Sequence, residues 1–69
     1  MSKVAMQIQV IGEPTGPGWQ RLDSIIREGQ AASLGARTYE FHMYSDACMF
    51  MEELNQQHVR YNVESIGDD

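Results

Sequence analysis

The chain has 69 residues, which is the length of one small domain, so we treat residues 1–69 as a single unit. A domain of this size buries only about 60% of the surface that its unfolded chain exposes, so self-association or a partner is expected to add burial. Ten acidic residues against five basic ones give a net charge of −5. This charge is opposite to the basic footprint of nucleic-acid-binding proteins, and we expect no direct nucleic-acid binding.

The cysteine content and the hydropathy pattern bear on the compartment. Cys48 is the only cysteine, so an internal disulfide is excluded, and a free thiol is typical of a reducing compartment. The sequence shows no long apolar run, no leader and no lipidation motif. We therefore expect a cytoplasmic protein that does not bind membranes, located in the host cell cytoplasm if a phage encodes it.

The first predicted element is a strand over residues 4–11. Apolar and polar residues alternate there with the two-residue period of a half-buried strand. One face carries Val4, Met6, Ile8 and Val10, and the other carries Ala5, Gln7 and Gln9. Residues 12–18 hold two prolines and three glycines, which cannot continue a strand ladder, so we expect a loop.

A helix is predicted next, over residues 18–33. Its apolar stripe has the three-and-four spacing of an amphipathic helix and consists of Trp19, Leu22, Ile25, Ile26 and Gly29. Gly29 is either the true helix end or a point of close approach to the sheet. Gly35 is a good stop signal, because glycine readily adopts the left-handed conformation that ends many helices.

The second half of the chain repeats this sequence of elements. Residues 37–45 form the clearest strand, with Tyr39, Phe41 and Met43 on the inner face. Ser45 or Asp46 then caps a helix that continues to about residue 57, whose inner stripe is Ala47, Phe50, Met51 and Leu54. The last strand covers residues 58–66, with Val59, Tyr61 and Val63 inward, and residues 67–69 are expected to be a frayed acidic tail.

The expected fold is α+β or small α/β, in the order strand, helix, strand, helix, strand. All three strands alternate instead of being apolar throughout, so one face of a three-stranded sheet should pack against both helices and the other should stay open. Right-handed crossovers allow both helices to lie on the same side. A split arrangement resembling a shortened ferredoxin-like unit is the alternative, and the pattern leaves the strand order open.

Polar residues dominate the open sheet face, namely Gln7, Gln9, Thr38, Glu40, His42, Tyr44, Arg60, Asn62 and Glu64. This face is either an ordinary solvated surface or a docking surface for a protein. An exposed edge strand could also pair with a second copy or with a target strand, and residues 37–45 are the candidate if they lie at an edge. The predicted contact residues are Glu40, His42, Tyr44, Arg60, Asn62 and Glu64, with Glu52 and Glu53 as a secondary acidic patch.

Catalysis by Cys48 and His42 is the rival interpretation. A thiol in the first turn of a helix has a lowered pKa, and a nearby histidine could act as its base. However, strand alternation directs His42 to the face opposite Phe41 and Met43, away from the helix that carries Cys48. The spacing of His42, Asp46, Cys48 and His58 matches no metal motif. The 12–18 loop has neither P-loop nor dinucleotide-binding spacing, so we predict no catalytic residue, no metal and no cofactor.

These features together favour a small acidic non-enzymatic protein-binding module, expected to be a homodimer. By size, charge and the lack of a catalytic constellation, the chain resembles in a general way the inhibitors of phages and mobile elements, including anti-CRISPR proteins. That resemblance implies an inhibitor that docks on a protein partner such as a basic nucleic-acid-binding complex. The alternative is a small enzyme or a ligand- or metal-binding domain that uses Cys48, His42 and a pocket beneath the 12–18 loop.

Overall fold

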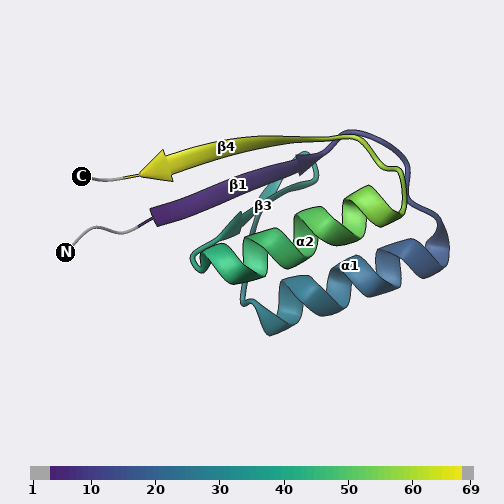
Figure 1. Ribbon diagram of the computed structural model, residues 1–69, viewed down its shortest axis with the longest axis horizontal. Coiled ribbons are helices and arrows are strands. Elements are labelled where there is room, and N and C mark those ends of the chain that lie inside the picture. Colours follow the sequence, from purple (N-terminus) through teal and green to yellow (C-terminus); the bar gives the residue numbers. More distant parts are fainter. Residues whose placement is uncertain (1–3, 68–69) are drawn as a thin grey trace.

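The computed structural model describes residues 4–67, which form two helices and four strands (Figure 1). In chain order the elements are β1 (Val4–Val10), α1 (Gly16–Glu28), β2 (Ala32–Gly35), β3 (Thr38–Phe41), α2 (Tyr44–Gln56) and β4 (Tyr61–Gly67). Neither helix is long and apolar enough to cross a bilayer within the described range. The predicted α+β class is confirmed, and the prediction of three strands is wrong because β2 was taken for the end of a helix.

The sheet has the order β2-β3-β1-β4, and all neighbouring strands are antiparallel. Each helix connects two strands between which a third strand lies, so the topology is the split βαβ pattern of ferredoxin-like folds. Residues 37–45 were a candidate for edge pairing only if they lay at an edge, and this condition is not met. Their strand part, β3, lies between β2 and β1 and is hydrogen-bonded on both sides.

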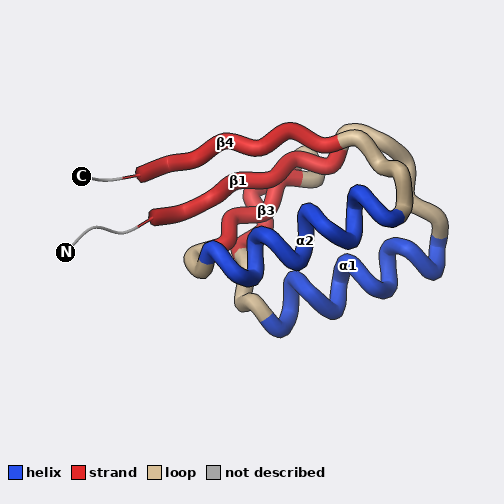
Figure 2. The backbone as a smooth tube through the Cα atoms, viewed as in Figure 1, coloured by secondary structure: helices blue, strands red, loops and turns tan. Residues whose placement is uncertain are grey.

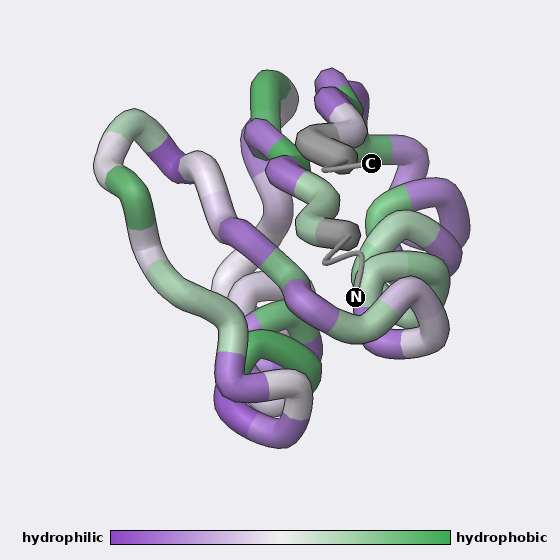
Figure 3. The backbone as a smooth tube through the Cα atoms, turned by 90° about the vertical axis from the view of Figure 1, so that its left-hand side faces the viewer, coloured by the Kyte–Doolittle hydropathy of each residue, from purple (hydrophilic) through white to green (hydrophobic). Residues whose placement is uncertain are grey.

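Both helices cover the same face of the sheet, as the backbone views show (Figures 2 and 3). The core between the two layers consists of Ile8, Val10, Leu22, Phe41, Ala47, Phe50, Leu54 and Val59. The ring of Phe50 lies at its centre, 5.7 Å from the ring of Tyr39 and 5.1 Å from that of Phe41. The alternating strands and the two apolar helix stripes thus produce one core, and the opposite sheet face stays free.

Helix α1 begins two residues earlier and ends five residues earlier than predicted. Thr15 is the N-cap, and its hydroxyl accepts a hydrogen bond from the Gly18 N–H at 3.2 Å. Pro17 fits the first turn because that position needs no N–H donor. Gly29 is the C-cap, where an added Cβ would lie 3.0 Å from the Asp46 Cβ. The close approach predicted for Gly29 therefore exists, but it is to α2 and not to the sheet.

Strand β2 and its hairpin to β3 were missed in the sequence because the turn lacks the usual residues. Ala36 and Arg37 both have positive φ, 51° and 58°, as in the two-residue turns that normally contain Asn-Gly or Gly-Gly. Contacts of Arg37 offset part of this strain. Its guanidinium lies 5.6 Å from the ring centroid of Trp19, forms an ion pair with Glu13 and donates to the Gly12 carbonyl at 3.2 Å.

We expect Ala36→Asn to stabilise the fold. The left-handed conformation costs alanine roughly 1–2 kcal/mol, and asparagine tolerates this conformation better. The free energy of unfolding should therefore rise by about 0.5–1 kcal/mol. Urea denaturation followed by circular dichroism measures this change. Ala32→Asn is the matched control, because Ala32 lies within β2 and has no positive φ. A gain of the same size in the control would contradict the turn explanation.

The β3–α2 junction differs from the prediction. Helix α2 starts at Tyr44 with Met43 as N-cap, and no side chain caps it, so the predicted cap at Ser45 or Asp46 is wrong. Met43 leaves the strand and is 61% exposed, which corrects its assignment to the inner face. Strand β4 starts at Tyr61 and includes Gly67, while residues 68–69 of the predicted tail lie outside the described residues.

Candidate functional site

Strand register arranges the open sheet face in two rows that cross three strands. Gln7 of β1 lies opposite Glu40 of β3 on one side and opposite Glu64 of β4 on the other. The second row has the same geometry, with Gln9 between Thr38 and Asn62. Directly opposed residues of antiparallel strands point to the same face, so all six side chains share this face. We call them the acceptor rows, comprising Gln7, Gln9, Thr38, Glu40, Asn62 and Glu64.

Two carboxylates with an amide between them form the first row. Strands lie about 4.8 Å apart, so the Glu40 and Glu64 backbones are separated by roughly 10 Å. The Gln7 side chain bridges part of this gap, donating from Nε2 to the Glu40 Oε2 at 3.4 Å. In the second row, the Gln9 Nε2 donates to the Ala36 carbonyl at 3.3 Å. Each amide thus uses one of its two N–H donors within the described residues, and its carbonyl oxygen stays available to other partners.

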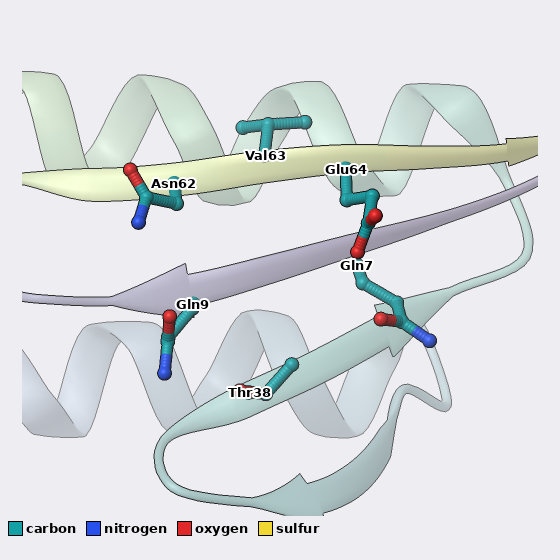
Figure 4. A pocket seen from close by; sticks show the side chains of 6 residues that line it. All are labelled: Gln7, Gln9, Thr38, Asn62, Val63 and Glu64. Atoms are coloured by element: carbon teal, nitrogen blue, oxygen red, sulfur yellow. The ribbon is translucent and has the colours of Figure 1, made fainter.

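An open depression of about 410 Å³ lies over these rows. Figure 4 shows its lining, and all but one of the residues belong to the acceptor rows: Gln7, Gln9, Thr38, Asn62, Val63 and Glu64. No lysine or arginine lines it among the described residues. Carboxylate, amide and hydroxyl oxygens therefore dominate its surface, and such a surface suits the N–H donors of a guanidinium or ammonium group.

Three of the predicted contact residues, Glu40, Asn62 and Glu64, share this face. Three others do not lie in a strand. His42 follows β3 as an exposed residue of the junction, and Arg60 precedes β4 and is also exposed. Tyr44 is the first residue of α2 and is 66% exposed, so its assignment to the sheet face is wrong. The strand ends at Phe41, and the prediction carried it four residues too far, to residue 45.

Glu52 and Glu53, the predicted secondary patch, point in different directions on α2. Glu52 is exposed. The Glu53 carboxylate is only 16% exposed, lies 3.9 Å from the Arg21 guanidinium and accepts a hydrogen bond from the Gln57 Nε2 at 2.9 Å. Glu53 therefore connects α2 to α1 and Glu52 alone presents a free carboxylate.

Cys48 contacts Tyr44, one helical turn earlier. The hydrogen bond between the two side chains raises the pKa of the Tyr44 phenol, so this phenol is neutral at physiological pH. Cys48 itself is half-buried. Within residues 4–67, no group of three or more His, Cys, Asp or Glu side chains could hold a metal ion.

A second depression, of about 340 Å³, lies beneath the proline- and glycine-rich loop. Its lining includes Arg21 and Gln57, but neither Cys48 nor His42. The Gln57 Nε2 donates to the Gly18 carbonyl at 3.2 Å, whereas the Gln57 Oε1 is buried without a hydrogen-bond partner. The loop pocket of the rival interpretation therefore exists, but the residues proposed to act in it do not line it.

Sequence reasoning placed Gln7, Gln9 and Thr38 on the open face but did not select them as contact residues. The signal that would have selected them is the strand register, which makes β1 the centre of both rows. No protein-family model matches the chain, and neither curated proteins nor solved structures give a match. Its function must therefore be inferred from the chemistry of its own surface.

Proposed function

We propose that this chain is a non-enzymatic protein-binding module that docks through its acceptor rows on a basic protein surface. The partner we favour is a nucleic-acid-binding protein whose exposed arginines normally contact phosphates. The module acts as a homodimer in the cytoplasm, or in the host cell cytoplasm if a phage encodes it. Inhibition of such a partner, as by the anti-defence proteins of phages, is the role that this chemistry supports.

The row Glu40, Gln7 and Glu64 is the observation that carries the proposal. Two carboxylates roughly 10 Å apart, with an amide oxygen between them, can receive two guanidinium groups at once. The net charge of −5 attracts a basic partner over distances of about 8 Å at physiological salt and raises the association rate.

The same face is poorly suited to single-stranded RNA. Four-stranded sheets that bind RNA stack bases on aromatic side chains of their strands and attract phosphates with basic residues. Here the open-face positions of the two central strands hold Gln7, Gln9, Thr38 and Glu40. These side chains offer hydrogen-bond acceptors and negative charge, which favour a cationic protein surface.

Removing both carboxylates of the first row tests the proposal. We expect Glu40→Gln/Glu64→Gln to weaken binding to an arginine-rich peptide by about a hundredfold or more, since each of the two lost charge-assisted contacts is worth about 1.5–3 kcal/mol. Fluorescence anisotropy with a labelled peptide at 0.15 M salt measures the dissociation constant. The same variant used as bait in an affinity pull-down from the native host should lose the partners that the unchanged chain captures.

The matched control is Glu28→Gln/Glu52→Gln, which removes the same charge from exposed positions on the two helices. This variant should bind within twofold of the unchanged chain. Equal weakening by both double variants would show that only the net charge matters, and the acceptor rows would then be rejected as the docking site.

A further inference from the structure

Strand β4 is a free edge of the sheet. Among residues 4–67, only β1 pairs with it, and its outer side has no partner strand. The opposite edge, β2, is short and irregular, with a register shift between Ser33 and Gly35. Short strands and bulges protect sheet edges from further pairing, whereas β4 has seven residues in regular register with no proline, lysine or bulge.

Hydrogen bonds next to β4 show which of its backbone groups point outward. The Ile11 N–H donates toward β4, to the Arg60 carbonyl at 2.8 Å. The Val10 N–H donates in the opposite direction, toward β3, to the Arg37 carbonyl at 3.0 Å. Bonded and non-bonded pairs alternate along an antiparallel ladder. Tyr61, Val63, Ser65 and Gly67 therefore direct their N–H and C=O groups away from β1, toward the free edge.

The helix side of this edge is incompletely covered. Val63 lies opposite Ile8, which is fully buried, and yet Val63 is 41% exposed. Helix α2 packs on β1 and β3, and β1 and β4 continue beyond its first turn (Figure 1). An apolar side chain at the middle of an edge strand thus remains in contact with solvent.

We propose that β4 pairs with β4 of a second copy, antiparallel and centred on Val63, to form one eight-stranded sheet. The proposal rests on the homodimer of the proposed function and adjoins the acceptor rows, because their β4 members, Asn62 and Glu64, lie on the pairing strand. In this register Val63 meets its symmetry mate on the helix side, which removes both side chains from water. On the open face each Asn62 lies opposite the other copy's Glu64, an amide beside a carboxylate, so no like charges are directly opposed.

Neighbouring registers are less favourable. Centring on Glu64 places the two Glu64 carboxylates directly opposite each other, in a non-hydrogen-bonded pair with Cα atoms about 4.5 Å apart. Centring on Asn62 pairs Ser65 with Val59, which precedes the strand and whose N–H already donates to the Leu54 carbonyl at 2.9 Å. The Val63 register pairs Tyr61, Val63 and Ser65 of the two strands with one another, opposes no two carboxylates, and leaves only Gly67, at the strand end, opposite Val59.

Proline at Ser65 tests the edge. It removes an outward N–H and leaves the β1 ladder intact, which edge strands tolerate. Sedimentation equilibrium should give twice the chain mass of 7.8 kDa for the unchanged protein and for Ser65→Ala, and a single chain mass for Ser65→Pro. If Ser65→Pro does not fold by circular dichroism, Val63→Lys replaces it, with Met49→Lys as control because Met49 is also exposed but lies on α2.

Oxidative cross-linking tests the register. In a Cys48→Ser background, Val63→Cys should form a disulfide-linked dimer, and Glu64→Cys should not. Cross-linking by Glu64→Cys alone would overturn the proposal. So would an unchanged protein that is monomeric at concentrations of about 0.5 mM, or a dimer that persists in both edge variants. A monomeric Ser65→Pro that still binds the arginine-rich peptide would support the edge dimer and leave the acceptor rows as an independent site.

Discussion

Phe50→Ala should destabilise the fold more than any other single truncation. The ring is fully buried and lies against Tyr39 and Phe41 of β3, so its removal leaves a cavity between α2 and the sheet. Such truncations cost about 3–5 kcal/mol. Domains of this length have a free energy of unfolding of roughly 3–10 kcal/mol, so much of the variant should be unfolded at 37 °C.

Urea denaturation at 10 °C, followed by circular dichroism, measures this loss. The control is Met49→Ala, the preceding residue of α2, whose side chain is exposed and whose truncation should cost less than about 0.5 kcal/mol. A loss below about 1 kcal/mol for Phe50→Ala would contradict the core described above.

Leu22→Ala should release α1 from the rest of the fold. Leu22 is the only fully buried large side chain of this helix, and the backbone of α1 lies closer to α2 than to any strand. We expect a loss of about 2–5 kcal/mol and faster hydrogen exchange in α1 than in β1 or β4.

Hydrogen exchange measured by mass spectrometry resolves the two regions. Ser24→Ala, an exposed position of the same helix, is the control and should leave both the stability and the exchange pattern unchanged within about 0.5 kcal/mol. Uniform loss of protection in Leu22→Ala would show that α1 does not open separately from the sheet.

The elements with a clear hydrophobic period were predictable, and those that depend on backbone strain were not. Alternation in residues 4–10 and the stripe through Phe50 and Leu54 follow directly from which side chains avoid water. The residues of β2 have no alternation, and the turn at Ala36 and Arg37 adopts a conformation that neither residue prefers. Only contacts made after folding, such as that between Arg37 and Trp19, stabilise it.

The sequence pattern predicted which strand residues share the open face, but not how their side chains are arranged on it. Alternation placed Glu40 and Glu64 on the open side, yet their position on either side of Gln7 depends on the register of three strands. That register is set by turn geometry and by pairing between strands that are distant in the sequence, and the hydrophobic pattern of a single strand does not predict it. Tyr44 was misplaced for a related reason, since α2 starts at a methionine cap that gives no signal in the sequence.

Pairing of β1 with β4 delays folding during synthesis. Strand β1 is synthesised well before β4 and finds its longest partner only when Gly67 has emerged, because the register runs from Val4 opposite Gly67 to Val10 opposite Tyr61. Such distant pairing slows folding relative to helical bundles. Until then β1 is itself an unprotected edge with an apolar row, so the nascent chain is the form most in need of a chaperone.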